Sequence, residues 1–311
     1  MISFSGVWVK ISHVTPTVSA FYRVLFGGLF LLAAACWQRE ITWKGWQRLQ
    51  LGFLCGAFLA LDLFLWHQSI QYIGPGLATI LGNFQVFLLA GLGVVFMGEK
   101  VSPRFFLAIV MAIVGLFLVV GIQWSQLGSQ YKTGVYLGLA TAVAYTAFLL
   151  VLRKLQAGET EAGSHLKKRI LVQDHGGAEF KTAGIRTYFE DFKRGTNNEI
   201  GQNDFFVIAS NTFYSLMLLS FASAVFLGLQ AVYSGDSFAI PDIQSWAALL
   251  LLGLTSQGIG WILISNALPR VRASFAGLIL LLQPSLAFIW DVLFFQRPTS
   301  TINWIGVIMA I

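Results

Sequence analysis

The sequence predicts an all-α integral membrane protein, with about ten transmembrane helices arranged as two inverted five-helix repeats. Three observations lead there. Hydrophobic residues make up 56% of the 311 residues, charged residues only 11%, and mean hydropathy is +0.72. A soluble domain carries roughly 25% charged residues, so a bilayer must solvate this apolar surface. Apolar runs of spanning length recur along the chain, and matching residues recur in its two halves.

The predicted spans follow from run length, because a helix needs about 20 apolar residues to cross the hydrocarbon core. The full-length runs are 17–37, 49–70, 75–98, 105–123, 134–152, 205–232, 246–268 and 273–295. Runs 2–11 and 302–311 are each about half a span, so we expect the first and last helices to be cut short. Glycine and proline within these runs are compatible with helices in lipid, where neighbouring helices satisfy the freed backbone groups.

The segment 154–204 breaks the apolar pattern. It holds 16 of the 34 charged residues and no run of spanning length, so it is predicted to be a hydrophilic cytoplasmic loop. A connection this long is unusual, and it is either a small appended element or disordered. A regulatory or partner-docking role and a tolerated insertion both remain open.

Orientation is predicted from the basic residues in the connections. With a cytoplasmic N-terminus, nine Lys and Arg residues fall on the inner side even without the seven at 167–194, and only Lys132 and Arg297 fall on the outer side. The positive-inside rule therefore predicts an inner-membrane protein whose N-terminus and loop 154–204 are cytoplasmic. The formal charge of +6 is explained by this topology, so we expect no nucleic-acid partner.

An internal repeat divides the chain into 1–123 and 134–311. Gln85 aligns with Gln283, and residues 111–113 align with 309–311, both at an offset of 198. Five helices per half is an odd number, so the second copy enters the membrane with the opposite orientation. This is the architecture of many secondary transporters, whose substrate site lies between the halves near the midplane.

Ionisable residues inside the spans are few and costly in lipid, so they are predicted to face a cavity. Arg23 and Asp62 are expected to pair, or together to hold a zwitterionic or anionic substrate. Asp62 and His67 are the candidates for proton coupling, since they could titrate in the cavity. Lys10 and Asp291 are weaker candidates, because Lys10 could snorkel to the interface and Asp291 could be a solvated helix end.

Neutral polar and aromatic residues complete the predicted site. Trp66 lies on the same helical face as Asp62, at i+4. The other candidate substrate-binding residues are Asn83, Gln85, Asn211, Tyr214, Gln257 and Gln283. Trp8 and Trp261 could add aromatic walls, although tryptophan also anchors helices at membrane interfaces and amides also join helices to one another.

No metal or cofactor is expected. His165 and His175 have no cysteine or clustered carboxylate at metal spacing, and the sequence has no phosphate-binding glycine motif and no nucleophile elbow. ATP-driven transport by this chain alone is therefore disfavoured, and the main prediction is a permease and not an enzyme.

Several segments resemble the EamA-type branch of the drug/metabolite transporter superfamily. They are 5–10 (Ser-Gly-Val-Trp-Val-Lys), 15–23 (Thr-Pro…Phe-Tyr-Arg), 98–103 (Gly-Glu-Lys-Val-Ser-Pro) and 283–299. In the last of these, Gln296 stands where an acidic residue is common. The resemblance implies ten helices in two five-helix repeats and a permease, often an exporter, for metabolites, amino acids or drugs.

Two other functions stay open. One is a non-transporting membrane scaffold that recruits a cytoplasmic partner through 154–204, and the other is an intramembrane enzyme that modifies lipids. The expected partners are a small-molecule substrate and the lipid bilayer, and a homodimer is compatible with the sequence.

Overall fold

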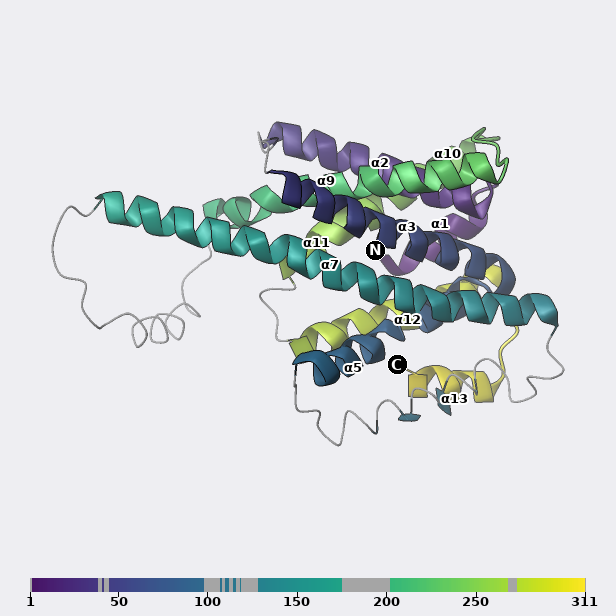
Figure 1. Cartoon of the computed structure of the whole chain (residues 1–311). Coiled ribbons are helices and arrows are strands. Elements are labelled where there is room, and N and C mark those ends of the chain that lie inside the picture. The colour runs from purple at the N-terminus through teal and green to yellow at the C-terminus, as the bar shows by residue number, and fades with distance from the viewer. Residues whose placement is uncertain are drawn as a thin grey trace.

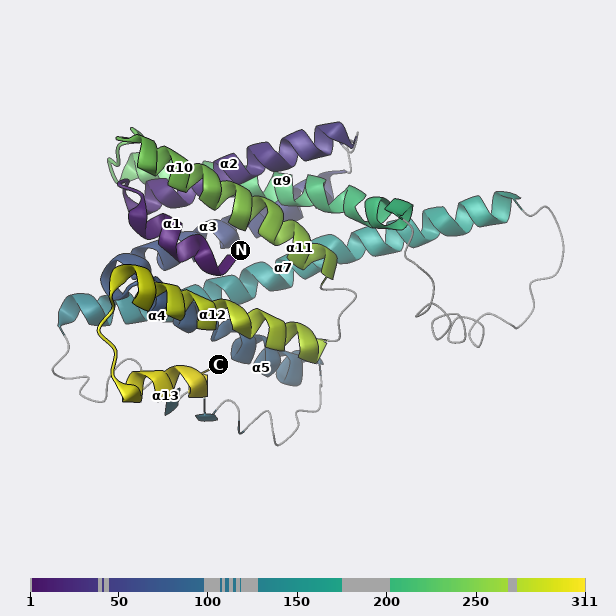
Figure 2. The ribbon, with the colours of Figure 1, turned by 180° about the vertical axis from the view of Figure 1, so that it is seen from behind.

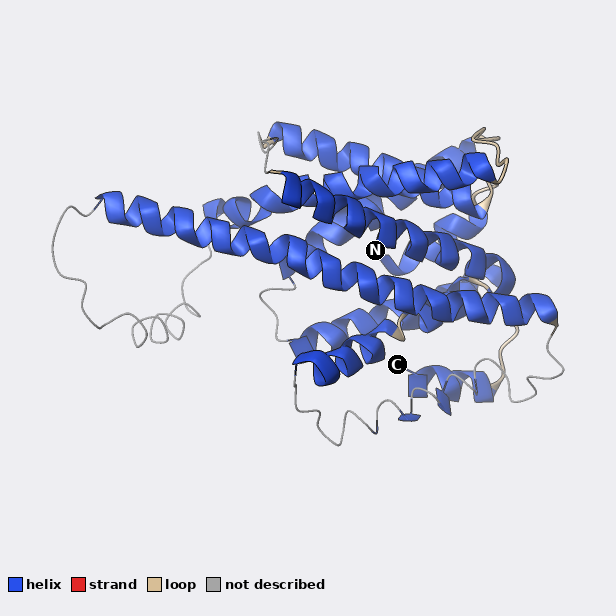
Figure 3. Ribbon diagram, in the orientation of Figure 1, coloured by secondary structure: helices blue, strands red, loops and turns tan. Residues whose placement is uncertain are grey.

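The computed structural model describes residues 2–38, 41, 45–97, 107, 110, 111, 114, 115, 118, 128–174, 202–267 and 273–310. Every regular element within these residues is a helix (Figures 1 and 3). The first part of the chain forms η1 (Ile2–Phe4), α1 (Ser5–Ile11), α2 (Pro16–Trp37), α3 (Trp46–Ile73), α4 (Pro75–Gly82) and α5 (Gln85–Met97). The later part forms α7 (Ser129–Asp174), α9 (Gln202–Tyr233), α10 (Ile243–Leu252), the π-helical segment η3 (Gly253–Gly260), α11 (Trp261–Ala267), α12 (Ala273–Phe295) and α13 (Thr301–Ala310).

Five helical stretches of the described chain are long and apolar enough to cross a membrane. They are Pro16–Trp37, Trp46–Ile73, Ser129–Leu152, Phe213–Tyr233 and Ile243–Ser265. About half of each stretch is buried inside the protein, and the rest presents large apolar side chains such as Val143, Leu229 and Leu263 to the outside. A lipid-facing surface explains this exposure, because acyl chains solvate apolar side chains at no cost. The prediction of an all-helical, multi-pass membrane protein is confirmed.

The centre of the bundle is formed by α2, α3, α7 and α9. In the tightest packing α3 contacts α7 and α9, and α2 contacts α9 and η3. Their shared core contains Leu31, Leu59, Phe148, Leu216 and Leu219, each almost fully buried. α10 and α12 lie on the face opposite to α3 and α7 (Figure 2).

Glycine allows two of these crossings to be close. A Cβ added at Gly56 on α3 would lie 2.5 Å from the Ala222 Cβ on α9, and one added at Gly27 on α2 would lie 2.4 Å from the Gln257 Cβ on η3. The Ser223 hydroxyl also donates to the Gly56 carbonyl at 2.8 Å. Small residues and interhelical hydrogen bonds are the usual means of packing helices in lipid, where no hydrophobic force holds helices together.

Two predicted helices are interrupted. The span 75–98 was expected to be continuous, but α4 ends at Gly82 and α5 begins at Gln85. At the break the Asn83 side chain donates to the Thr79 carbonyl at 2.8 Å, and the Phe84 amide bonds the Leu81 carbonyl at 3.1 Å, in a tighter i→i−3 turn. Asparagine competes for backbone groups in this way, which is why a hydrophobic run alone did not show the break.

The span 246–268 was also expected to be regular, and it contains the eight π-helical residues of η3. Glycines at both ends of this segment, Gly253 and Gly260, tolerate the wider turn. α12 continues through Pro284 over the predicted range, and most of the predicted span 105–123 lies outside the described residues.

The predicted loop 154–204 requires a correction, because α7 does not end at the membrane boundary. It continues as one helix to Asp174 and projects from the bundle (Figure 1). The segment 153–174 is rich in Leu, Lys, Arg, Glu, Gln and Ala, which favour helix, and its two glycines cost only about 1 kcal/mol each. α9 then begins at Gln202, within the predicted loop, and residues 175–201 lie outside the described part.

Candidate functional site

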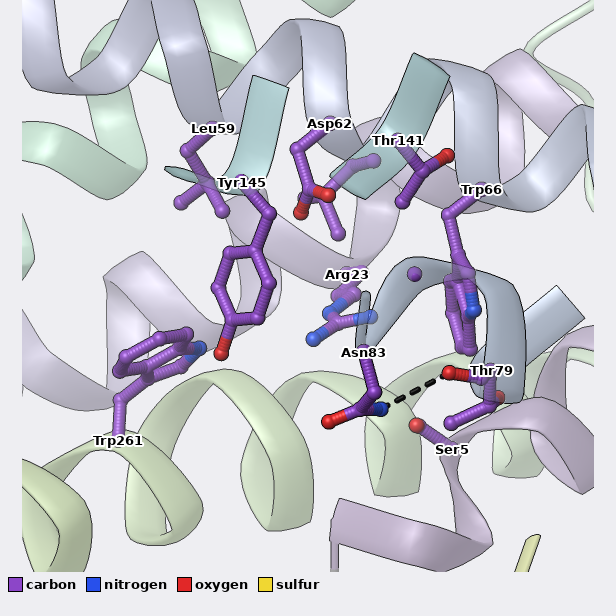
Figure 4. Close-up of a pocket in the computed structure, with 12 residues that line it drawn as sticks. Ser5, Arg23, Leu59, Asp62, Trp66, Thr79, Asn83, Thr141, Tyr145 and Trp261 are labelled. Atoms are coloured by element: carbon purple, nitrogen blue, oxygen red, sulfur yellow. Dashed lines mark hydrogen bonds between the residues drawn. The ribbon is translucent and has the colours of Figure 1, made fainter. Parts of the chain in front are cut away.

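A small cavity lies where α1, α2, α3, α4, α7 and α11 meet. Its volume is about 60 Å³, and its lining combines charged, amide, hydroxyl and aromatic groups. The lining residues are Ser5, Arg23, Leu59, Asp62, Leu63, Trp66, Thr79, Gly82, Asn83, Thr141, Tyr145 and Trp261 (Figure 4). A cavity of this size has room for a few water molecules, since one water needs about 10–15 Å³.

Arg23 lies at the centre of the cavity. It is seven residues into α2, which begins at Thr15-Pro16 with proline at the first helical position, where no backbone donor is lost. The guanidinium carbon lies 5.5 Å from the centre of the Trp66 ring. A cation over an aromatic face gains about 0.5–2 kcal/mol, which offsets only part of the cost of about 2.5 kcal/mol or more for arginine in a membrane.

Asp62 faces the same cavity from α3. Leu59, Asp62 and Trp66 repeat at helical spacing, so α3 presents them on one face. Asp62 and Arg23 are both almost fully buried, yet the described residues include no direct ion pair between them. A guanidinium and a carboxylate, both buried, therefore line one cavity without a direct ion pair.

The polar rim comes from α4 and α7. Thr79 and Asn83 lie one turn apart on α4, at the break before α5, and Thr141 and Tyr145 lie one turn apart on α7. The Arg23 Nε and Trp261 Nε1 atoms are buried and have no protein partner among the described residues. Buried donors usually have a partner, so these two mark hydrogen bonds beside the cavity that the protein itself leaves unmade.

The structure brings together five of the residues predicted for the site, namely Arg23, Asp62, Trp66, Asn83 and Trp261. Sequence reasoning missed Ser5, Thr79, Thr141 and Tyr145. The i, i+4 pairs Thr79/Asn83 and Thr141/Tyr145 within apolar runs were the signal that could have found the last three, because each pair marks a polar stripe on one helical face.

Other predicted residues lie beside the cavity. Gln85 is buried close to Tyr145. His67 is fully buried with its ring against Trp66, at 5.1 Å between centroids. Neither residue lines the cavity.

The remaining predicted residues lie elsewhere in the described structure or outside it. Gln257 donates to Ser220 at 2.9 Å within the second half, and Trp8 packs on Phe4. Tyr214, Gln283 and Lys10 are half-buried and away from the lining. The side chain of Asn211 lies outside the described part.

Asp291 is not a solvated helix end. It is buried and accepts hydrogen bonds from Arg297 at 3.1 Å and from the Gly76 amide at 3.1 Å. Arg297 follows six residues later and folds back over the end of α12, which a linear count of helix depth could not show. Among the described residues no group of three or more His, Cys, Asp or Glu side chains could hold a metal ion.

The fold and the cavity define a multi-pass, all-helical membrane protein with a polar chamber between its helices. The chain belongs to the EamA-like transporter family, whose model matches residues 1–121 and 206–311. It is thus a membrane transporter of the drug/metabolite type, as the sequence resemblance implied. The family consists of transporters rather than enzymes.

Comparison with solved structures agrees at the level of the fold. One crystal structure of a protein, 15% identical, matches 99% of this chain and 94% of its own with a TM-score of 0.59. At this identity the likeness concerns the fold alone. A comparison with curated proteins found no match.

Proposed function

We propose that this chain is a secondary permease that moves a small, dipolar or anionic metabolite through the Arg23–Asp62 cavity by alternating access. The observation that carries the proposal is the pair of opposite, buried charges that share one cavity without an ion pair. Arg23 supplies donors for a carboxylate or phosphate, and Asp62 supplies an acceptor for an ammonium group. Asn83, Thr79 and Tyr145 add neutral hydrogen bonds that fix orientation.

The cavity is too small for such a molecule in this conformation. Small-molecule sites usually measure about 300–1,000 Å³, so the helices around the cavity must move apart to admit a substrate. A bound substrate would then alternate between two openings of the bundle, as transporters built from two halves do.

Helix packing supports two halves of opposite orientation. The internal repeat pairs α2 with α9, α4 with α12, and α3 with α10 and η3. If each helix is exchanged with its partner in this repeat, the same contacts result, because α2 packs on α9 and α4 packs on α12. The contact of α3 with α9 likewise corresponds to that of α10 and η3 with α2. In Figure 1, α2 and α9 run in opposite directions, as do α3 and α10. Rocking of one half against the other is the movement that this pattern supports.

The basic residues support an orientation. We place the end of the bundle where α2 ends, α3 begins and α7 projects on the cytoplasmic side of the inner membrane (Figure 1), because the Lys and Arg excess gathers in the connections at this end.

The test is uptake and efflux of a substrate panel in proteoliposomes, with amino acids, organic anions and cationic drugs as separate arms. Arg23→Ala and Asp62→Asn are the variants. Lys154→Ala is the control for Arg23→Ala, because it also removes a positive charge but at an exposed position on α7. We expect Arg23→Ala to reduce transport about tenfold or more, because a charged hydrogen bond contributes about 1.5–3 kcal/mol. Asp62→Asn should affect ammonium-bearing substrates more than simple anions. Full transport by an Arg23→Ala protein that is folded and inserted would overturn the proposal.

The extension of α7 favours a second function, recruitment of a cytoplasmic partner. It projects beyond the bundle and lies outside the residues that the family model matches. Deleting 156–201 separates the two functions, since a permease should keep its transport and a scaffold should lose its partner.

A further inference from the structure

A set of hydrogen bonds joins the two halves of the chain at one end of the bundle. This end, which we call the short-loop end, holds the α1–α2, α3–α4, α9–α10 and α12–α13 connections (Figure 2). Its contacts form two groups, one at each side.

The first group joins the α1–α2 connection to the start of α10. The His13 Nδ1 atom lies 2.6 Å from an Asp242 carboxylate oxygen, and the His13 amide donates to the Ser245 hydroxyl at 2.9 Å. The Gln244 amide donates to the Ile11 carbonyl at 3.0 Å. Asp242 also caps the start of α10 by accepting a hydrogen bond from the Ser245 amide at 2.8 Å. The same carboxylate therefore caps a helix of the second half and contacts His13 of the first half.

A further bond extends this group toward the cavity. Tyr22 precedes Arg23 on α2, and its hydroxyl donates to the Phe238 carbonyl in the α9–α10 connection at 2.7 Å. The ring of Phe21 packs edge-on against Phe238, with 5.1 Å between centroids. The helix that carries the central arginine is therefore tied at this end to the second half.

The second group joins the α3–α4 connection to the end of α12. Arg297 donates to the Ile73 carbonyl at 2.8 Å and to Asp291 at 3.1 Å, and Asp291 accepts from the Gly76 amide at 3.1 Å. A Cβ at Gly74, where φ is +83°, would lie 2.8 Å from an Asp291 oxygen. The α3–α4 turn is therefore packed closely against Asp291 at this point.

The two groups differ in their exposure to solvent. The side chains of His13 and Asp242 are 58% and 37% exposed, whereas those of Arg297 and Asp291 are 17% and 4% exposed. Solvent screens an exposed ion pair, which forms and breaks at little cost. On the buried side, opening would break the bond from Arg297 to the Ile73 carbonyl and the bond from the Gly76 amide to Asp291. Each break leaves a buried polar group without a partner, so this side resists opening more strongly.

We propose that the short-loop end is a gate over the Arg23–Asp62 cavity, closed in this structure, with His13–Asp242 as its latch and Arg297–Asp291 as its pivot. The inference rests on the proposed function, and it adds which side of the bundle opens. Arg23 lies roughly 10 Å along α2 from its start, at 1.5 Å per residue, so the cavity is within reach of an opening at this end. Opening on the side of the latch exposes the cavity, while the pivot keeps the α3–α4 connection against α12.

A reversible cross-link tests the latch. His13→Cys/Asp242→Cys, in a background of Cys36→Ser and Cys55→Ala, is treated with a short bifunctional methanethiosulfonate. We expect transport in proteoliposomes to fall at least tenfold and to return on reduction. The matched control is Gln230→Cys/Ser234→Cys, a hydrogen-bonded pair of positions at the end of α9. Both positions belong to the second half, so the same cross-link does not connect the halves and should leave transport intact. Full transport by the cross-linked latch would overturn the proposal.

A second measurement does not depend on transport. Spin-label pairs are placed across the latch, at Thr15 and Ser237, and across the pivot, at Tyr72 and Pro298, and their distances are measured in liposomes with and without Asp242→Asn. We expect the variant to add longer distances for the latch pair only. If both pairs lengthen, or neither does, the latch-and-pivot assignment is wrong. If the latch pair lengthens but Arg23→Ala transports normally, the gate stands and the proposed substrate site fails.

Discussion

The crossing of α3 and α9 permits a quantitative test of the packing, through Gly56→Ala. The added Cβ would lie 2.5 Å from the Ala222 Cβ and 2.9 Å from the Leu219 carbonyl oxygen. Carbon atoms in contact are ordinarily about 3.5–4.0 Å apart, so the two helices must separate locally by about 1 Å. Overpacking of this kind costs typically 1–3 kcal/mol.

Gly91→Ala is the matched control, because Gly91 also lies inside a helix and a Cβ added there meets nothing within 4 Å. Alanine favours helix over glycine by about 1 kcal/mol at both positions, so this gain cancels in the comparison. The expected difference between the two variants is therefore the overpacking cost alone.

The assay is thermal unfolding of the purified protein in detergent, and the measured quantity is the fraction of protein that remains monodisperse at each temperature. At about 2–4 °C per kcal/mol, Gly56→Ala should melt roughly 2–12 °C below Gly91→Ala. A Gly56→Ala protein that melts at or above the control would show that α3 and α9 do not cross this closely, and the core built on that crossing would have to be redrawn.

Three further outcomes are expected. Asp291→Asn should lower stability by about 3 kcal/mol, since it leaves the largely buried Arg297 without its carboxylate, and adding Arg297→Gln should recover part of the loss in a double-mutant cycle. Gln296→Gly should raise the melting temperature by an amount equivalent to about 1 kcal/mol, because Gln296 ends α12 with φ at +49°, where a side chain is strained; no gain would exclude that strain. The hydrogen bond with His13 lowers the pKa of Asp242, and the bond from the Ser245 amide lowers it further to a smaller extent. The Asp242 carboxylate therefore stabilises the fold above its unfolded pKa, and this contribution is lost as pH falls through the lowered folded-state pKa. The difference in melting temperature between wild type and Asp242→Asn should shrink from about pH 6 to about pH 3, and a constant difference would contradict this.

Much of the cavity could be found from the sequence, because lipid penalises charge. Arg23 and Asp62 are so costly against acyl chains that they must face a protein interior, and Trp66 follows from Asp62 by helical spacing. Thr79 and Thr141 were missed because the hydroxyl of a threonine can bond a carbonyl of its own helix. Thr79 and Thr141 bond the carbonyls four residues earlier, at 2.7 and 2.9 Å, and could face either way.

The sequence by itself determined that the chain crosses a membrane, where most of the spans lie and which charges need shelter, because the bilayer imposes these requirements on each helix separately. Only the tertiary structure decided the break at Asn83, the burial of Asp291 beneath Arg297 and the pairing of His13 with Asp242 over 229 residues. Each of these depends on which groups from distant segments meet, and no hydrophobic period along one helix carries that information.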